Sequence, residues 1–404
     1  PGVRSHLAGR HHDCHGHECQ PDEQSTMAAA LKLSADAQIE SLAQQNGTSH
    51  LYTDPSGIEW VHPGPLEGCP APDHRPAEVL PDQIVSATKI NDWQQCKRKW
   101  WLRWYRQLDS VTDLTDVRNT GIRVHEALAA WYVPEGTERQ DPRDVLREAI
   151  GRDWNKTLER MQLTPQSEGF EAVAKKWESV AVLERAMIEG YMEWMEETGA
   201  DAGYTVIGSE LEVAVNIPDP VTGMTVQARG VVDAKIRRDV DGVRLFIDHK
   251  SVGDFERATR FLKMRNQMLH YHMIELLTTG EGEARCDGAL YNMLRRVKRT
   301  AKAKPPFFQR KTVEHTEIQI SAYRERLLGE AASMARAEQM LEAGVSHHRA
   351  VPPSPSDDCH WKCEFAAVCP MFDDGSRAED MLAAVYHQGD PWQRYDLLGP
   401  GTTT

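Results

Sequence analysis

The sequence has no apolar segment long enough to cross a membrane. A transmembrane helix needs about 20 mostly apolar residues, and no run of even about 18 occurs in the chain. The N-terminal region also lacks the basic stretch followed by an apolar stretch that marks a secretory signal. We therefore expect an intracellular, cytoplasmic protein that acts without contacting a membrane.

The chain also has no surplus of positive charge. Its 47 Lys and Arg residues are outnumbered by 61 Asp and Glu residues, so the formal net charge is -14. This balance argues against a protein that coats nucleic acid, but not against a nucleic-acid enzyme, for which the clustering of positive charge matters. Positive charge clusters at 97–106 (KRKWWLRWYR), where aromatic residues are interleaved, and at 295–311, which has eight Lys or Arg residues and no acid. Each cluster is either a nucleic-acid surface or an ordinary solvated face.

Two further absences narrow the function. The sequence has no GxxxxGK[ST] phosphate-binding loop, so we expect no ATPase motor within this chain, and it has no internal repeats. Cysteine is present at eight positions. In an intracellular protein such cysteines are more often metal ligands or free thiols than disulfide partners.

Residues 1–80 have the composition of a disordered N-terminal extension. They show no periodic apolar pattern, and their last part is rich in Pro and Gly. The tract HHDCHGHEC (11–19) has the composition of a metal site. Because no apolar segment surrounds this tract, we interpret it as accidental composition.

The rest of the chain shows the patterns of an α/β protein, with helical spacing in some segments and apolar–polar alternation in others. Helices are predicted at 86–108 (capped by Ser86 or Thr88), 121–133, within 140–198, at 255–280 and at about 314–343. Strands are predicted at 204–217, 224–238, 243–252 and 288–297. We divide this part into a helical subdomain (81–203), a sheet-containing core (204–312), a C-terminal helix with a cysteine segment (313–375) and a tail (376–404).

The third predicted strand contains the triplet Asp248-His249-Lys250. Side chains two apart on a strand point to the same face, so Asp248 and Lys250 share a face. A carboxylate can hold a divalent cation, and a neighbouring ammonium can position water and offset negative charge during phosphodiester hydrolysis. The preceding strand contains Asp233, and counting back from the turn at 239–242 places it roughly opposite Asp248. Both acids lie in apolar runs, where a carboxylate is costly unless it is paired or bound to metal.

Two helical features fit the same chemistry. His125 lies on a predicted amphipathic helix, and its imidazole is able to complete a metal shell. Gln267 and Tyr271 are four residues apart on the predicted helix that follows Lys250, so they share one face and are placed to contact a nucleic-acid strand. Taken singly, each of these residues is more simply a packed histidine or the edge of an amphipathic helix.

The order of these residues resembles the PD-(D/E)xK nuclease superfamily, in the branch of RecB-like nuclease domains and CRISPR-associated exonucleases. That branch carries a histidine on a helix, then GxxD, DxK and QxxxY motifs. The matching residues here are His125, Gly230 to Asp233, Asp248 to Lys250, and Gln267 to Tyr271. The resemblance implies a restriction-endonuclease-like fold, in which a central mixed sheet is flanked by helices and carries a helical insertion.

The resemblance also implies roles for single residues. It implies that His125, Asp233 and Asp248 hold Mg2+ or Mn2+ and that Lys250 is the catalytic lysine. Glu210, in SELEV, occupies the place of a further catalytic glutamate on the first core strand.

Three cysteines, Cys359, Cys363 and Cys369, lie in one short C-terminal segment, and Pro370 follows the last of them. The resemblance implies that Cys96, on a helix before the core, is the fourth ligand, and that the four thiolates hold a [4Fe-4S] cluster which clasps the two ends of the domain together. Four thiolates can equally hold zinc, so the chemistry of the ligands leaves both metals open. The first gap in the C-terminal segment has three residues, where the resemblance implies two. No role is assigned to the remaining cysteines, which are Cys14, Cys19, Cys69 and Cys286.

We therefore predict a metal-dependent deoxyribonuclease, an exonuclease that acts on DNA ends or single strands in recombination, repair or phage replication. The two basic clusters would guide the DNA backbone, and their aromatic residues would stack on bases. The DNA-binding residues predicted from these clusters and from the QxxxY motif are Lys97, Arg98, Arg295, Arg296, Gln267 and Tyr271. The alternative is a non-catalytic DNA-binding subunit of a larger complex, with a helicase, a recombinase or a CRISPR-adaptation protein as partner.

Overall fold

The computed structural model describes residues 49–53, 59–63, 75–76, 80–110, 114–280 and 282–392, and it divides the chain into two units, 1–78 and 79–404. The first unit contains three short strands, β1 (Ser49–Thr53), β2 (Glu59–Pro63) and β3 (Arg75–Pro76), which form an antiparallel sheet in the order β2-β1-β3. The sequence pattern predicted no strand in this part. The tract 11–19 and Cys69 lie outside the described residues.

The second unit is built on a six-stranded mixed sheet with the order β10-β9-β8-β7-β4, in which β6 also pairs with β7. The pairs β7–β8, β6–β7 and β9–β10 are antiparallel, whereas β8–β9 and β4–β7 are parallel. The strands are β4 (Gln83–Val85), β6 (Tyr204–Pro218), β7 (Thr225–Arg238), β8 (Arg244–Val252), β9 (Gly288–Arg295) and β10 (Phe308–Glu314). This mixed sheet confirms the predicted fold class, and the strands at β6 to β9 lie where the alternating pattern predicted them.

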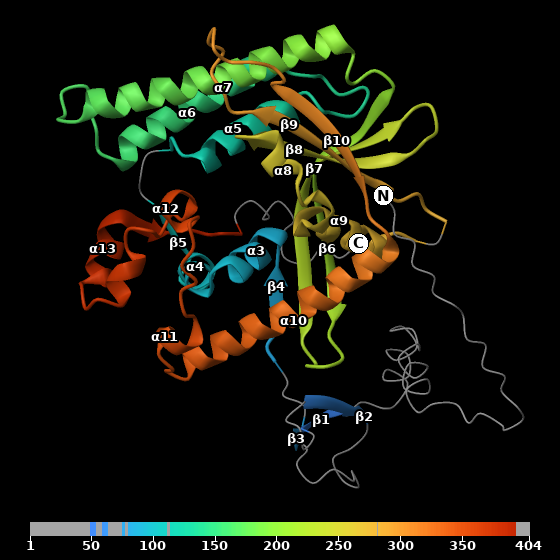
Figure 1. Cartoon of the computed structure of the whole chain (residues 1–404), viewed down its shortest axis with the longest axis vertical. Coiled ribbons are helices and arrows are strands. Elements are labelled where there is room, and N and C mark those ends of the chain that lie inside the picture. The colour runs from blue at the N-terminus through green and yellow to red at the C-terminus, as the bar shows by residue number, and fades with distance from the viewer. Residues whose placement is uncertain are drawn as a thin grey trace, which may run out of the picture. The chain divides into compact units, whose positions relative to one another are not determined.

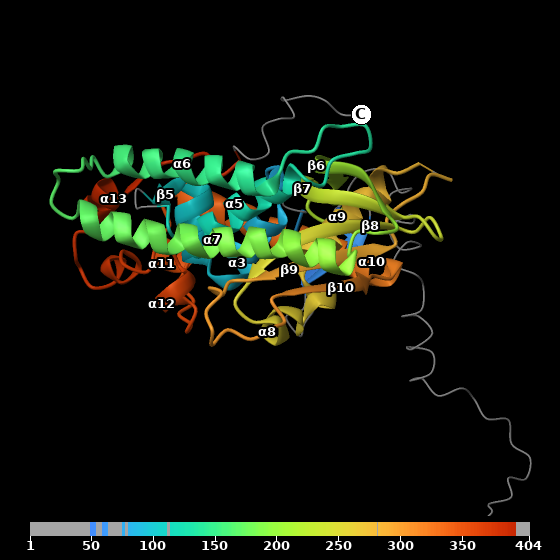
Figure 2. The same cartoon turned by 90° about the horizontal axis from the view of Figure 1, so that it is seen from above.

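Helices cover both faces of this sheet (Figure 1). One face packs against α5 (Val117–Ala129), α6 (Pro142–Arg160) and α7 (Phe170–Thr198), through a cluster that includes Val124, Tyr191 and Ile247. The other face packs against α9 (Asn266–Thr278) and α10 (Glu317–Glu342). Figure 2 shows α6 and α7 running side by side over the sheet, with α9 and α10 away from them.

The predicted helix at 86–108 is broken at Cys96. Helix α3 (Ala87–Gln95) begins at Ser86, whose hydroxyl accepts a hydrogen bond from Lys89 N, as the predicted cap requires. Cys96 then has an extended backbone (φ -164°, ψ 116°), and α4 (Lys97–Trp100) and a π-helical turn (Trp101–Tyr105) follow. After the break, Trp100, Trp101 and Trp104 are buried, whereas Tyr105 is exposed.

Two other predicted segments differ in detail. The predicted helix at 255–280 consists of α8 (Phe255–Thr259), a 3-10 turn (Leu262–Met264) and α9. Strand β10 begins within the basic stretch 295–311 and continues beyond it. Its apolar residues Phe308 and Val313 are buried, but they stand among charged residues, so the sequence pattern did not predict a strand there.

The C-terminal segment returns to the first helices of the second unit. It contains α11 (His347–Ala350), α12 (Cys359–Lys362), a 3-10 turn (Cys369–Phe372), α13 (Ala378–Val385) and β11 (Tyr386–Gln388). Strand β11 pairs with β5 (Leu108–Ser110), which directly follows the π-helical turn. Among the described residues, no helix is long and apolar enough to cross a membrane.

Candidate active site

The two acids of the β7–β8 hairpin meet where these strands separate. The register pairs Ala234 with Ile247, and its continuation places Asp233 opposite Asp248, as counting from the turn predicted. The backbone pairing of β7 and β8 ends at this point. The next hydrogen bond between the strands involves a side chain: Asp233 Oδ2 accepts it from His249 N at 2.8 Å. Both carboxylates are buried, and Asp248 is only 1% exposed.

His125 reaches this point from helix α5. Its Nδ1 lies 3.2 Å from Asp233 Oδ2. The helix passes close to β8 at Gly121, where a Cβ would lie in ordinary van der Waals contact with Ser251 Oγ at 3.6 Å. The buried residues Val124 and Leu128 fix the same face of α5 against the sheet. The predicted histidine therefore lies beside the predicted acid.

Lys250 is held from the opposite side by helix α9. Its Nζ lies 2.8 Å from Asp248 Oδ1 and donates a hydrogen bond to Gln267 Oε1 at 2.7 Å. Gln267 Nε2 in turn donates to Tyr271 OH at 3.2 Å. The QxxxY pair thus positions the lysine.

Tyr271 is itself anchored to strand β7. Its hydroxyl donates to Val231 O at 2.6 Å, and its ring lies over Gly230. A Cβ at Gly230 would lie 2.5 Å from Tyr271 Cε1, so only glycine leaves room for the ring. The glycine of the GxxD motif and the tyrosine of the QxxxY motif therefore depend on each other.

The charges of the site are set by burial and by close neighbours. Burial alone would raise the pKa of Asp233, but the adjacent His125 outweighs it, so the pKa is lowered. The pKa of His125 is raised: burial lowers it, but the neighbouring Asp233 raises it by more. For Asp248, burial dominates over Lys250 and raises the pKa. A further positive charge beside Asp248 would therefore stabilise the ionised form of its carboxylate.

The donor atoms fit a divalent cation. Among the described residues, the buried Asp248 Oδ2 has no hydrogen-bond partner, Asp248 Oδ1 has only the Lys250 ammonium at 2.8 Å, and His125 Nδ1 has only Asp233 Oδ2 at 3.2 Å. Carboxylate oxygens and imidazole nitrogen are ligands that Mg2+ and Mn2+ accept. His125 Nδ1 lies directly against Asp233 Oδ2, and the described residues contain no group of three or more His, Cys, Asp or Glu that could hold a metal ion as they stand.

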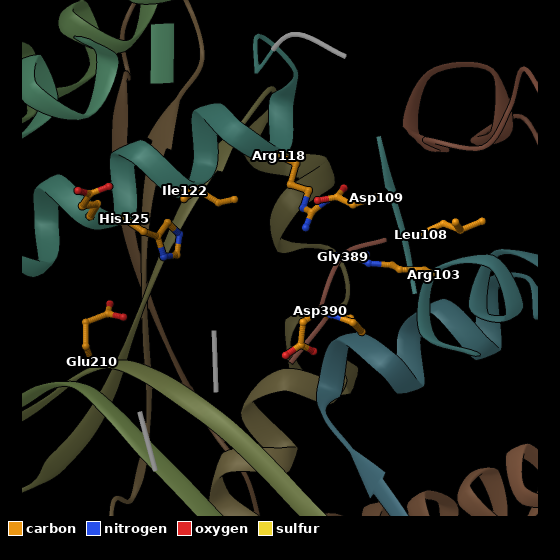
Figure 3. A pocket seen from close by; sticks show the side chains of 11 residues that line it. Arg103, Leu108, Asp109, Arg118, Ile122, His125, Glu210, Gly389 and Asp390 are labelled. Atoms are coloured by element: carbon orange, nitrogen blue, oxygen red, sulfur yellow. The ribbon is translucent and has the colours of Figure 1, made fainter. Parts of the chain in front are cut away.

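Glu210 lies on β6 with a left-handed backbone (φ 46°), and its side chain is exposed. It lines a cavity of about 420 Å³ beside His125. Figure 3 shows Glu210 and His125 at one end of this cavity and Arg103 and Arg118 at the other. The arginines are paired, Arg118 with Asp109 at 3.5 Å and Arg103 with Glu364 at 3.8 Å.

Glu212 is a residue that the sequence reasoning missed. Both of its carboxylate oxygens are buried without a hydrogen-bond partner. Leu211 and Val213 pack in the cluster beneath α9, so Glu212 points to the other face of the strand, where α5 lies. The signal was present in SELEV, whose two glutamates are two residues apart.

We expect Glu212→Met to stabilise the protein, because it removes a buried carboxyl group that has no hydrogen-bond partner among the described residues and keeps the length of the side chain. The free energy of unfolding should rise by about 1 kcal/mol or more in urea titration. The matched variant Glu210→Met should change it by less than about 0.5 kcal/mol, since that side chain is exposed. A lower unfolding free energy for Glu212→Met would mean that its carboxylate is paired.

The predicted DNA-binding residues are divided between the surface and the interior. Arg98 is 1% exposed, and its guanidinium pairs with Asp373 at 2.6 Å and donates to Cys369 O at 3.2 Å. Tyr271 is buried as described. The geometry therefore favours a structural role for Arg98 and Tyr271 over the predicted contact with DNA. Lys97 is exposed, with its Nζ 5.1 Å from the Trp93 ring.

The aromatic residues of the first basic cluster are core residues. Trp100, Trp101 and Trp104 are all buried in the main hydrophobic cluster, so they are not placed to stack on bases. In the second cluster, Arg295 Nη1 donates to Lys304 O at 3.2 Å, whereas Arg296 Nη1 is buried without a partner. Of the two, Arg296 therefore has a buried donor that an anion could bind.

The two segments that carry the four cysteines of the predicted cluster lie close together. Cys96 Sγ accepts a hydrogen bond from Ser354 N at 3.4 Å, and Arg98 Nη1 lies 3.9 Å from Cys369 Sγ. Burial raises the pKa of the Cys363 thiol to about 11 and also raises that of Cys369, against the effect of Arg98. Cys96, Cys359, Cys363 and Cys369 are all free, and within the described part of the chain they form no metal-holding group.

Comparison with known proteins identifies the class of domain. A family model described as the PD-(D/E)XK nuclease superfamily matches residues 84–370. No curated protein matches the chain. Solved structures do match, among them the crystal structure of SSO0001, which is 11% identical. That match covers 72% of this chain and 88% of the other, and its TM-score of 0.28 is too low to support any argument.

Proposed function

The chain belongs to the PD-(D/E)XK nuclease superfamily, and from this membership we propose that it is a metal-dependent deoxyribonuclease that acts as an exonuclease on DNA ends or single strands. The observation that carries the proposal is the meeting of Asp233, Asp248 and Lys250 where β7 and β8 separate, with His125 against Asp233. These residues come from three elements. Among the described residues, the buried Asp248 carboxylate has only the Lys250 ammonium as a partner, which leaves its Oδ2 available to a cation.

His125, Asp233 and Asp248 are the residues that would hold the cation. When bound, Mg2+ or Mn2+ would offset the charge that develops on the phosphate and lower the pKa of a bound water. Lys250, fixed by Gln267, presents its ammonium to the same place and is the donor that would orient the attacking water or stabilise the phosphate oxygens. The His249 N–H bond to Asp233 fixes the orientation of that carboxylate.

The cavity beside His125 supports action at a strand end. Gly389, Asp390 and Pro391 form one of its walls, so a strand that entered from the active site would meet the C-terminal segment there. We expect linear DNA with a label at one end to lose mononucleotides, while a covalently closed single-stranded circle of the same sequence stays intact. Cleavage of the circle at a comparable rate would show an endonuclease and overturn this part of the proposal.

We also propose that Cys96, Cys359, Cys363 and Cys369 hold a [4Fe-4S] cluster, with zinc as the alternative. The chemistry of four thiols and the contacts between their two segments support this proposal. Their present positions do not form a metal-holding group, so the sulfurs would have to draw together around the metal.

Anaerobically purified protein should be brown, with a broad visible absorption band and with iron and sulfide in equal amounts. Cys96→Ser should remove the colour and lower the free energy of unfolding without touching the hydrolytic residues. A colourless protein that contains one zinc would support the alternative, and a protein without either metal would contradict both.

A further inference from the structure

The turn that follows strand β8 exposes two large apolar side chains. Phe261 is 63% exposed and Met264 is 70% exposed, and they flank the 3-10 turn between α8 and α9. Met264 N donates a hydrogen bond to Phe261 O at 3.0 Å, so the two residues are held in a fixed relation. Single exposed apolar side chains are common on protein surfaces, so this pair needs the further support that its surroundings give.

The turn is anchored to the hydrophobic core by a buried residue. Leu262, between the two exposed residues, is 4% exposed and packs in the cluster that contains Phe246 and Tyr271. Arg265 Nη2 donates to Ala258 O at 2.9 Å and closes the segment on itself. The exposed pair is therefore presented by an ordered element, and little entropy would be lost when it binds a partner.

This surface adjoins the candidate active site. Gln267, which holds Lys250, comes three residues after Met264. At the other side, Arg296 N donates to Val252 O at 2.7 Å, at the end of the strand that bears Lys250. A Cβ on Gly253 would lie 3.7 Å from Arg296 Nη2, so the guanidinium lies over the first residue of the connection.

Arg296 has the surroundings of an anion-binding group. Its Nη1 is buried and has no hydrogen-bond partner within the described part of the chain. Burial lowers its pKa, and no neighbouring acid acts against that effect. A guanidinium without an acidic partner is suited to a phosphate, which accepts two of its hydrogen bonds.

The segment around the exposed pair is rich in basic side chains, although the whole chain is acidic. Arg257 on α8 and Arg260 at its C-cap are exposed, and Lys263 lies between Phe261 and Met264 in the sequence of the turn. Acidic neighbours are present as well: Asp358 lies 3.8 Å from Arg257, Glu256 lies 3.6 Å from Arg260, and Asp254 caps α8. Within 254–265, however, four basic residues stand against two acidic ones. An aromatic ring and a thioether among basic residues match a single nucleic-acid strand, whose bases offer free faces and whose backbone is anionic.

We propose that Phe261 and Met264 form a stacking surface for single-stranded DNA next to the active site, with Arg296 binding a backbone phosphate at its inner edge. The inference rests on the proposed function and specifies it, because it assigns one path of the strand on the side of Lys250. A paired duplex keeps its base faces covered and would gain little from this surface. A docking protein, the other class of partner, would leave DNA binding unaffected by changes here.

The test measures binding without hydrolysis. Full-length protein in EDTA is titrated with a fluorescein-labelled 20-nucleotide single strand and with the blunt duplex of the same sequence. We expect the double variant Phe261→Ala/Met264→Ala to raise the Kd for the single strand about tenfold and to change the Kd for the duplex less than twofold. The matched control Val240→Ala/Ile318→Ala, which removes side chains that are 86% and 82% exposed elsewhere, should change neither.

The phosphate contact proposed for Arg296 is tested by the dependence of Kd on salt concentration. Arg296→Met should reduce the slope of log Kd against log salt for the single strand by about 0.7, the value of one lost phosphate contact. An unchanged Kd for the single strand in the double variant, or an equal loss for the duplex and the single strand, would overturn the proposal. Because the assay needs no turnover, a protein that binds as expected but fails to hydrolyse DNA in Mg2+ would contradict the proposed nuclease and leave the surface supported.

Discussion

Replacing Lys250 with alanine is expected to lower the rate of Mg2+-dependent DNA hydrolysis by about 10²–10³-fold and to leave the fold intact. The ammonium lies 2.8 Å from Asp248 Oδ1 and is oriented by Gln267, so its removal takes away one fixed donor from the place where charge develops on the phosphate. The rate should be measured with the purified variant on end-labelled DNA, together with its urea unfolding curve.

Asp248→Asn separates a catalytic from a structural role. A structural carboxylate is usually hydrogen-bonded on both oxygens, and its removal destabilises the fold. Among the described residues, however, the buried Asp248 Oδ2 has no hydrogen-bond partner, and Oδ1 has only the Lys250 ammonium at 2.8 Å. We therefore expect hydrolysis to fall by at least about 10²-fold while the free energy of unfolding drops by less than about 1 kcal/mol.

The matched control for these two variants is Lys175→Ala, which removes an exposed lysine from α7. It should keep both the rate and the stability of the original protein. Full hydrolysis by both Lys250→Ala and Asp248→Asn would contradict the assignment of the site, and a loss of rate that only follows unfolding would reduce these residues to structural ones.

Arg123→Met is expected to have the largest effect on stability, with a loss of about 3–5 kcal/mol in the free energy of unfolding. The side chain of Arg123 is fully buried and binds Glu184 on α7 through two hydrogen bonds, at 2.7 and 3.0 Å. It also donates to Asp153 on α6 at 3.0 Å. Its loss would leave the buried Glu184 carboxylate without its cation and Asp153 with only the more distant Arg152 and Lys156, at 3.4 and 3.9 Å. Because Arg123 precedes His125 by two residues on α5, hydrolysis should weaken as the helix loosens.

Two variants identify the cause of that loss. Arg143→Met breaks an exposed pair with Asp141 and should cost less than about 1 kcal/mol. The triple variant Arg123→Met/Asp153→Leu/Glu184→Leu removes the charges together and should recover most of the lost stability, because no buried charge is left unpaired. If Arg123→Met and Arg143→Met had equal effects on urea unfolding, the buried cluster would not carry the stability assigned to it.

The hairpin that bears the acids could be predicted because its signals are local. The alternation of β7 and β8 and the turn between them fix which residues face each other, so Asp233 was correctly placed opposite Asp248. The four-residue spacing of Gln267 and Tyr271 likewise predicted one shared face. What it did not reveal is the use of that face, which positions Lys250 and holds Tyr271 inside the protein.

Other features depend on tertiary contacts that a local pattern does not contain. The break at Cys96 interrupts a segment whose spacing continues to favour a helix, and it turns Trp100 and Trp104 into the core instead of toward DNA. Strand β10 was hidden by the charges of the basic stretch. Glu212 looked like Glu210 in sequence, and only burial distinguishes them.

The central claim is that His125, Asp233, Asp248 and Lys250 form a metal-dependent hydrolytic site, and hydrolysis of linear DNA before and after removal of divalent cations tests it most directly. The purified chain should degrade DNA in Mg2+ or Mn2+, lose all activity in excess EDTA, and regain it when the metal is added back. Degradation that continues in EDTA, or a folded protein that stays inactive with either metal, would contradict the account.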